Sequence, residues 1–176
     1  MELALKELKT QAKKLLKAVK LDSDMLLKNE TPLKELDLSL IDELKLKQCL
    51  TIVSQQLGFR NWHHAQDVLS GKIKNIENLN MGTFFYPQGA DGFINEWFAN
   101  YQQAKSTLSA QAGEKWILPY KNQFIVVKKD YILAFKLNEK STMLWSVIDH
   151  NMVDSYKSEA WDKIALEIIR NRTKNY

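Results

Sequence analysis

The stretch Leu57-Gly58-Phe59-Arg60-Asn61-Trp62-His63-His64 decides how the first part of this chain folds. It stands between two segments with helical apolar spacing. Gly58 suits the left-handed backbone that often follows the last turn of a helix, and the Asn61 side chain can cap the next helix. Phe59 and Trp62 are apolar anchors that can hold the turn against a core. The stretch therefore predicts a structural corner between two helices.

Helical patterns extend on both sides of this corner. The first helix carries one apolar stripe, formed by Leu5, Leu8, Ala12, Leu15, Leu16 and Val19. Residues 21–38, with Pro32 as a breaker, predict a short helix and turns. Residues 39–57 predict a second long helix, because Ser39-Leu40-Ile41-Asp42 resembles a capping arrangement. The helix after the corner is expected to span residues 61–70.

Aromatic residues divide the chain into two halves. Of the 18 Phe, Trp and Tyr residues, only Phe59 and Trp62 precede residue 80. The boundary, residues 70–82, is rich in Gly and Asn and is typical of a linker or loop. We therefore expect a helical module over residues 1–75 and a second domain over residues 80–176.

The second half mixes strand and helix patterns. The expected strands are 82–86, 116–120, 123–128 and 131–137, and the expected helices are 91–110, a short turn at 144–148, and 157–171. Short polar connections between the later strands favour an antiparallel meander. The sequence thus predicts an α+β fold: an all-helical N-terminal module of three or four helices, followed by a small antiparallel sheet with helices packed on one face.

Composition narrows the class of protein. The hydrophobic fraction of 45% and charged fraction of 26% are those of a globular protein. The sequence has no apolar run of roughly 20 residues that could span a bilayer, and its start does not resemble a signal peptide. Cys49 is the single cysteine, so an internal disulfide is excluded. A reducing cytoplasm is the expected compartment.

Charge is unevenly distributed along the first half. Residues 1–20 hold six basic and two acidic residues, whereas residues 21–43 hold two basic and seven acidic ones. Five lysines form a stripe at helical spacing: Lys6, Lys9, Lys13, Lys17 and Lys20. The stripe is either a solvated face, a surface that pairs with acidic residues of this module or of another protomer, or a nucleic-acid contact.

The corner also allows two functional interpretations. A Gly-containing turn between short helices is typical of a helix-turn-helix, in which Arg60, His63, His64 and Gln66 would face a partner or nucleic acid. The set is poor in phosphate-binding residues. Adjacent histidines on a helix point about 100° apart, so His63 and His64 do not chelate one ion together. We predict no metal and no cofactor.

The sequence contains no complete catalytic set. It has no phosphate-cradling glycine loop, nucleophile elbow or His-Glu-x-x-His motif. Cys49 falls on the apolar stripe of its helix, where an inert buried thiol is expected. Asp149, His150 and Asp154 are close in sequence and predict a turn before the last helix. No residue is therefore assigned a catalytic role.

Two segments carry a resemblance to a known family. Lys9-Thr10-Gln11-Ala12-Lys13-Lys14-Leu15-Leu16 and Cys49–Trp62, which ends in Leu-Gly-Phe-Arg-Asn-Trp, are similar to the small helical glyoxalase-related domain of bacterial proteins. The resemblance covers residues 6–70 and implies a helical module. A metal-binding glyoxalase domain needs His and Glu ligands on paired βαβββ units, whereas this chain has three histidines and no such repeat. The resemblance therefore implies no enzymatic activity.

We expect a bacterial cytoplasmic protein that acts by binding another protein or a second copy of itself. The first alternative is a nucleic-acid-associated protein that uses the corner and the lysine stripe. The second alternative is an enzyme with a pocket between the two halves.

Overall fold

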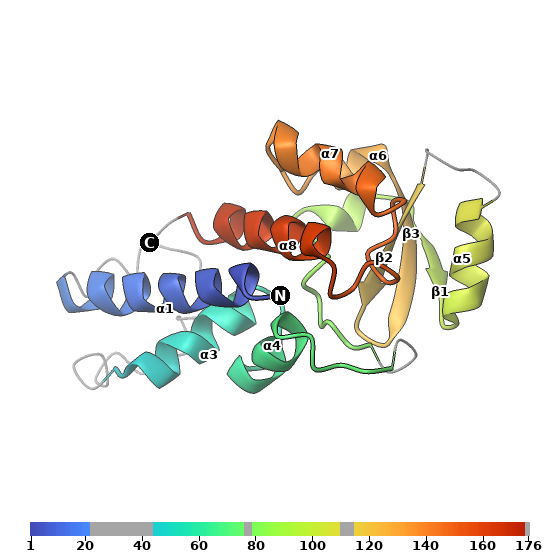
Figure 1. The fold of residues 1–176 in the computed structure, drawn as a ribbon. Helices are drawn as coiled ribbons and strands as arrows, with labels where there is room; N and C mark the ends of the chain where they lie inside the picture. The colour runs from blue at the N-terminus through green and yellow to red at the C-terminus, as the bar shows by residue number, and fades with distance from the viewer. Residues whose placement is uncertain (22–43, 76–78, 110–114, 175–176) are drawn as a thin grey trace.

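The computed structural model describes residues 1–21, 44–75, 79–109 and 115–174 (Figure 1). Three of the described helices precede residue 70: α1 (Leu3–Leu21), α3 (Leu46–Gln56) and α4 (Trp62–Leu69). The remaining elements are η4 (Ala90–Gly92), β1 (Glu96–Phe98), α5 (Tyr101–Ser109), β2 (Lys115–Tyr120), β3 (Gln123–Lys128), α6 (Lys129–Leu133), α7 (Glu139–Val147) and α8 (Glu159–Arg172). Within these ranges no helix is long and apolar enough to cross a membrane.

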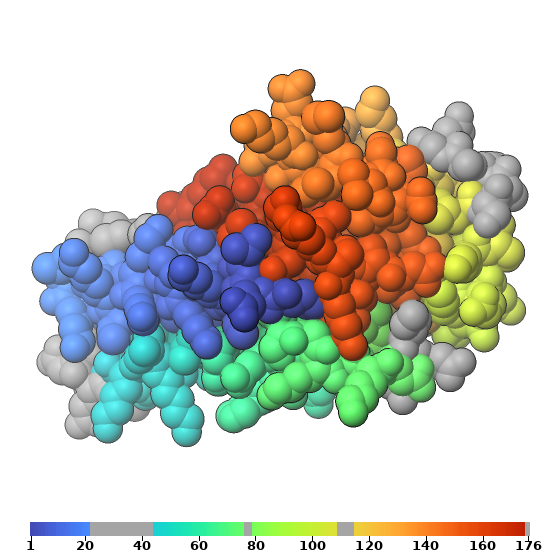
Figure 2. All heavy atoms as spheres, in the orientation of Figure 1, coloured from blue at the N-terminus to red at the C-terminus, as the bar shows by residue number. Residues whose placement is uncertain are grey.

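Helix α1 is the long outer helix of the molecule and packs on α3, α4 and α8. Its buried side chains recur every three or four residues, as the sequence predicts for one helical face: Ala4, Leu8, Gln11, Ala12, Leu15 and Val19. Figure 2 shows α1 lying directly against α8 and the segment that contains α4. The first and last helices of the chain are therefore neighbours.

One carboxylate joins these two helices. Asp162 of α8 is 4% exposed, and its Oδ2 accepts hydrogen bonds from the backbone N–H groups of Glu2 and Leu3 at 2.8 and 3.0 Å. Its Oδ1 accepts from the N–H of Ala4 at 3.0 Å. The first amides of a helix have no partner within the helix, so Asp162 caps α1 from another element. It also lies in the first turn of α8, where a negative charge is favourable.

The sheet is antiparallel and has the order β1-β3-β2. The predicted strands 116–120 and 123–128 correspond to β2 and β3, which pair from Lys115↔Lys128 to Tyr120↔Gln123. Residues 150–152 cover the outer edge of β2: Ile117 N–H donates to the His150 carbonyl at 2.9 Å, and Met152 N–H donates to the Ile117 carbonyl at 3.0 Å. β1 forms the opposite edge.

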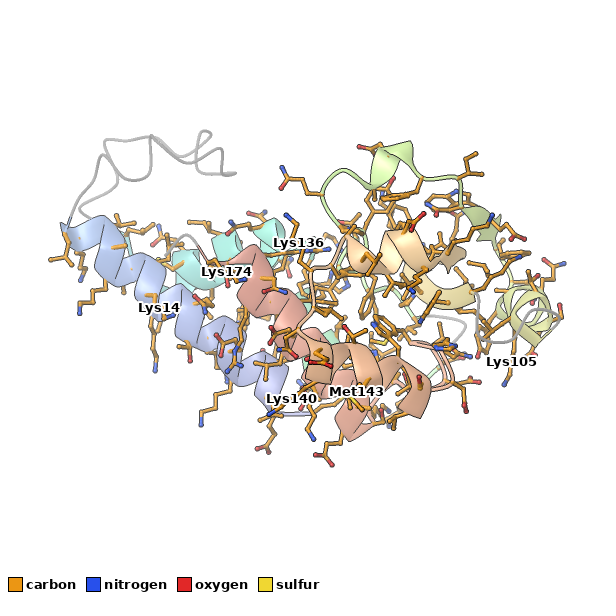
Figure 3. All side chains as sticks on the ribbon, turned by 90° about the horizontal axis from the view of Figure 1, so that it is seen from above. Lys14, Lys105, Lys136, Lys140, Met143 and Lys174 are labelled. Carbon is orange, nitrogen blue, oxygen red and sulfur yellow. The ribbon has the colours of Figure 1, made fainter. Side chains whose placement is uncertain are left out.

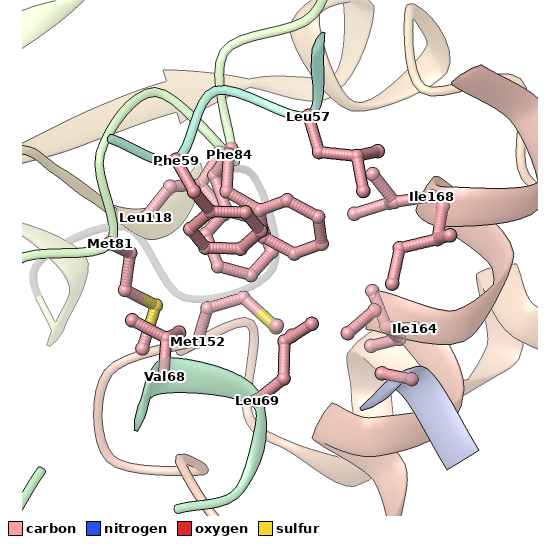
Figure 4. Packing of buried hydrophobic residues seen from close by; sticks show 14 of the residues in the cluster. Leu57, Phe59, Val68, Leu69, Met81, Phe84, Leu118, Met152, Ile164 and Ile168 are labelled. Carbon is pink, nitrogen blue, oxygen red and sulfur yellow. The ribbon is translucent and has the colours of Figure 1, made fainter. Parts of the chain in front are cut away.

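Different elements cover the two faces of the sheet. Helix α5 packs on one face, where the Tyr101 ring lies 5.3 Å from that of Phe124. On the other face, Leu118 joins a cluster with Phe84 and Phe59 (Figure 4). The predicted α+β class, with N-terminal helices and a small antiparallel sheet, is confirmed.

The two halves of the chain share one hydrophobic core. Figure 4 shows Leu57 and Leu69 from the first half beside Met152, Ile164 and Ile168 from the second. These side chains are at most 1% exposed. Burial of apolar surface is the main favourable contribution to folding, so each half supplies stabilising contacts to the other.

Three predicted elements in the second half are wrong. Residues 82–85 form turns where a strand was expected, with Tyr86 N–H donating to the Thr83 carbonyl at 2.9 Å. The expected helix 91–110 is divided into η4, β1 and α5, because Trp97 and Phe98 pair with Ile125 and Phe124 of β3. Pairing with a distant strand thus overrides the local helical spacing.

The expected third strand of the meander, 131–137, is also wrong. The chain turns directly from β3 into the short helix α6, and Ala134 N–H donates to the Asp130 carbonyl at 3.3 Å. The apolar alternation seen in the sequence comes instead from Tyr131, Ile132 and Phe135, which are buried on one side of this helical turn. A short apolar run does not distinguish a strand from a buried helix.

Other predicted elements lie outside the described residues or have different ends in the structure. The short helix expected in 21–38 and the cap at Ser39–Asp42 lie outside the described ranges, apart from Leu21, which ends α1. Helix α3 begins at Leu46, after Lys45, whose backbone N–H is capped by Gln48 Oε1 at 2.7 Å. The short turn expected at 144–148 is part of the longer helix α7.

The Asp162 cap generates a stability prediction. Asp162→Ala leaves three helix amides without their acceptor, so we expect the free energy of unfolding to fall by about 2–3 kcal/mol. Asp162→Asn retains one acceptor oxygen and should lose less. Urea denaturation followed by circular dichroism measures both. Glu159→Ala, which changes an exposed carboxylate in the same turn, is the control. Equal stabilities of Asp162→Ala and Glu159→Ala would contradict the role of the cap.

Candidate binding surface

The corner stretch Leu57–His64 connects α3 to α4. Gly58 has φ of +89°, which a glycine adopts without strain. Asn61 Oδ1 accepts a hydrogen bond from His64 N–H at 3.0 Å and so caps α4. Phe59 is 3% exposed and stacks on Phe84, with ring centroids 4.9 Å apart. These residues fix the angle between the two helices.

A second segment crosses the corner at very close range. Thr83 N–H donates to the Gly58 carbonyl at 2.9 Å. A Cβ added to Gly82, which has φ of +59°, would overlap that carbonyl oxygen, and a Cβ added to Gly58 would overlap Thr83. Both positions therefore need glycine for space as well as for backbone conformation. The sequence indicates the need at Gly58 but not the crossing with Gly82, which is distant along the chain.

His64, expected as a contact residue, is held within the corner. Its Nδ1 accepts a hydrogen bond from the backbone N–H of Arg60 at 3.0 Å. Nε2 lies 2.7 Å from the carbonyl oxygen of Asn80, so in this arrangement Nε2 carries the proton and donates it. Both ring nitrogens are used, and the ring edge meets Phe59 at 5.6 Å. His64 links the corner to the crossing segment and is not available to a partner.

Arg172 at the end of α8 completes the corner. Its Nη2 donates to the Tyr86 carbonyl at 2.9 Å and its Nη1 to the Leu57 carbonyl at 3.4 Å. The guanidinium lies 5.9 Å from the rings of both Phe84 and Phe135. Burial lowers its pKa to about 10, so it remains charged at neutral pH. A cation in the last turn of a helix is ordinary, and no sequence signal identifies this role.

Helix α1 presents a row of exposed lysines. We call its five predicted stripe residues Lys6, Lys9, Lys13, Lys17 and Lys20 the lysine ridge. Each is exposed, and none lies within 4.0 Å of a described carboxylate oxygen. Lys14, a neighbour of the ridge, points away from the body of the molecule in Figure 3.

Glu7, an acidic residue of α1, pairs with residues other than the ridge lysines. Glu7 turns toward α8, where its Oε2 lies 3.5 Å from Arg170 Nε, and its Oε1 accepts from Gln11 Nε2 at 2.6 Å. Its side chain is 15% exposed. The Glu7 carboxylate therefore lies in the interface between α1 and α8, on a different face of α1 from the lysine ridge.

The structure brings the ridge next to one corner residue. Lys9 Nζ lies 5.8 Å from the centre of the Trp62 ring, within the range of a cation–π contact. Trp62 is only half-buried, although the sequence indicates a core anchor. Its position at the start of α4, beside α1, leaves part of the ring in solvent. Trp62 thus belongs to the accessible surface as well as to the corner.

The other predicted contact residues lie on the same two elements. Arg60 and His63 are exposed, and Gln66 is half-buried. Asp67 on α4 pairs with Lys72 at 3.3 Å. Apart from the contact between Lys9 and Trp62, no described interaction joins these side chains to the ridge. We call the ridge together with Arg60, Trp62, His63 and Gln66 the candidate binding surface.

The described residues show no assembled catalytic or metal-binding set. Within the described ranges, no three His, Cys, Asp or Glu side chains converge to hold an ion. Burial raises the pKa of the Cys49 thiol to about 11, so it stays protonated and is a poor nucleophile. Asp154 accepts from Lys105 Nζ at 2.6 Å, while His150 packs on Trp116 with ring centres 4.7 Å apart. These groups therefore serve structural contacts.

The glycine crossing predicts a difference between two substitutions. Gly82→Ala adds a methyl group against a backbone oxygen and should lower the free energy of unfolding by about 2–4 kcal/mol. Gly89→Ala is the matched control, because Gly89 also has a positive φ, +80°, but no atom lies within 4 Å of its added Cβ. It should cost about 1 kcal/mol. Thermal or urea unfolding measures both, and equal losses would contradict the close crossing.

The partly buried His150 predicts a pH dependence. Burial lowers the pKa of its imidazole below the ordinary 6.5, and the nearby Asp149 opposes this only in part. Below that pH the unfolded chain binds the proton more readily than the folded one, so stability should fall as pH decreases. His150→Asn, which tolerates the positive φ of 57°, should reduce this slope in urea midpoints measured from pH 7.5 to 5.5. If the urea midpoint of His150→Asn changed with pH as steeply as that of the wild type, titratable groups other than His150 would cause the loss of stability.

Comparison of the chain with protein-family models, with curated proteins and with solved structures finds no match. The resemblance of residues 6–70 to the glyoxalase-related domain therefore stays a prediction.

Proposed function

We propose that this protein is a non-enzymatic binding protein of the bacterial cytoplasm. Its candidate binding surface contacts an acidic surface of another protein or of a second copy of this chain. The observation that carries the proposal is the lysine ridge, whose ammonium groups are exposed and lack carboxylate partners among the described residues.

The overall charge distribution supports an acidic partner. The whole chain has a net charge of +4, and residues 1–20, which include the lysine ridge, hold six basic and two acidic residues. Like charges along one helix face repel one another and destabilise the helix. An acidic partner relieves this repulsion, and long-range attraction speeds its association.

Trp62 supports a recognition surface in preference to a merely solvated lysine face. Tryptophan is enriched at the energetic centres of protein interfaces, where part of its ring is buried by the partner. Here the half-exposed ring lies beside Lys9 and close to the start of α4. A partner that covers the ring would also meet the exposed Arg60 and His63.

Nucleic acid is the second candidate partner. It is favoured by the combination of lysines with an aromatic ring, which resembles single-strand binding surfaces. Helix α4 is a weaker reading element, because it has eight residues and its exposed Asp67 is acidic. Lysines also lack the bidentate geometry with which arginine recognises phosphate and guanine.

A triple charge reversal tests the proposal. Lys9→Glu, Lys13→Glu and Lys17→Glu together should abolish recovery of the partner in affinity purification from the native host, with both protein and nucleic acid identified. The matched control reverses Lys74, Lys129 and Lys140, which are exposed elsewhere and cause the same change in net charge. Both proteins should keep the wild-type circular dichroism spectrum, because the lysines of both sets are exposed.

The outcomes separate the partners. A partner protein, or a concentration-dependent dimer in light scattering, that is lost only in the ridge variant supports the proposal. Recovery of nucleic acid, with an affinity that falls steeply with salt, supports the second candidate. Equal binding by the ridge variant, the control and the wild type would overturn any role of the ridge.

A further inference from the structure

The two edge strands of the sheet differ in the hydrogen bonds that their outward-facing backbone groups make. The outer edge of β2 is bonded to residues 150–152. β1 pairs only with β3, and its other side makes no backbone hydrogen bond to any described residue. In an antiparallel pair, alternate residues direct their N–H and C=O groups away from the partner. At least one of the three β1 residues therefore presents these groups at an open edge.

Exposed apolar side chains flank this open edge. Ile94 is 96% exposed and Trp97 is 46% exposed. The Trp97 ring meets Tyr120 edge-on, with centroids 5.0 Å apart, and Tyr120 in turn lies 5.2 Å from Tyr86. The Tyr120 ring thus covers part of the indole, and the rest of the indole is accessible. An exposed apolar edge strand is a template for pairing with another chain.

The charges around the edge are positive. The acidic residue of β1, Glu96, is paired with Lys115 of β2 at 2.6 Å. Lys121 and Lys128 flank β3 at its two ends, and both are exposed and without a carboxylate partner among the described residues. Lys121 Nζ lies 5.3 Å from the Tyr120 ring. The register places Lys128 level with Ile94, and Lys121 lies beside the Tyr120 ring that Trp97 contacts, so one cation lies toward each end of β1.

We propose that β1 binds an extended acidic peptide segment of a partner protein by strand addition. The peptide backbone pairs with the open side of β1, an apolar side chain covers Trp97 and Ile94, and carboxylates approach Lys121 and Lys128. Strand addition to an open edge is an established mode of peptide recognition. This inference rests on the proposed function only in assuming that the protein acts by binding. The surface at β1 is different from the candidate binding surface on α1 and α4.

A second copy of the chain fits this edge less well than a peptide does. Stable interfaces bury about 1,600 Å² in total, which a strand of three residues and two exposed apolar side chains do not supply. In a dimer, β1 would pair with β1 of the second copy about a two-fold axis. Lys121 and Lys128 of one copy would then approach the same lysines of the other copy, and these like charges would repel one another. A flexible acidic segment avoids both problems.

The test uses the full chain and a short synthetic peptide that alternates valine and threonine and carries glutamate near each end. NMR titration should shift the backbone amides of residues 94–98 and slow the solvent exchange of those on the open side. Two N-methylated forms of the peptide, each blocked at one set of alternate residues, provide the decisive comparison. One form should lose binding at least tenfold, because its pairing N–H groups are removed, while the other should bind as before.

Protein variants identify the edge independently. Trp97→Thr with Ile94→Thr should weaken peptide binding at least tenfold, whereas Val147→Thr, which changes a valine 70% exposed on α7, should leave it unchanged. The variant that combines Lys9→Glu, Lys13→Glu and Lys17→Glu should still bind the peptide. Failure of the ridge proposal can therefore be distinguished from failure of the strand-addition proposal.

Several results would overturn the inference. Equal binding by both N-methylated peptides would show side-chain docking without strand pairing. Amide shifts that depend on protein concentration without peptide would indicate self-pairing at β1, and displacement of the peptide by single-stranded nucleic acid would assign the aromatic edge to base stacking. Absence of binding to the unmodified peptide at millimolar concentration would reject strand addition.

Discussion

The carboxylate of Asp162 lies where the N-termini of two helices meet, and the arrangement of the rest of the molecule depends on it. It accepts three amides of α1 and stands in the first turn of α8. Each helix end carries a partial positive charge, so one buried anion satisfies both. The burial of Asp162 is possible because its oxygens are bonded to these amides. Because α8 also packs in the core that the sheet completes, the cap connects the helical half to the sheet half.

The corner is held in the same way, by backbone groups that meet partners from distant segments. Gly58 and Gly82 let two turns approach until the carbonyl of one accepts the amide of Thr83. Arg172 donates to carbonyls on both sides of this crossing. None of these contacts is between residues close in sequence. The corner is consequently formed by the whole chain, although its turn and cap are local features.

Structural features that depend on neighbouring residues could be predicted from the sequence, whereas pairing between distant segments could not. The spacing on α1, the Asn61 cap and the hairpin between β2 and β3 follow from patterns within a few residues. Residues 94–101 carry helical apolar spacing, yet Trp97 lies in a strand because β3 offers it a partner. The exposed lysines could be predicted, since a stripe of charge is seldom buried. The roles of Arg172 and of the edge at β1 could not, since each depends on segments that the fold brings together.

The positions of the accessible surfaces follow from what the core has already used. α1 buries one face on α3 and α8, and its Glu7 is drawn into that interface by Arg170. The outer face carries the lysine ridge, which has no carboxylate partner among residues 1–21, 44–75, 79–109 and 115–174. At the sheet, residues 150–152 close the β2 edge, whereas the outer side of β1 makes no backbone hydrogen bond within the part of the chain that the structure describes. Among the described residues, the packing that stabilises the fold therefore also determines which groups stay accessible: lysines along α1, and apolar side chains and one backbone edge at β1.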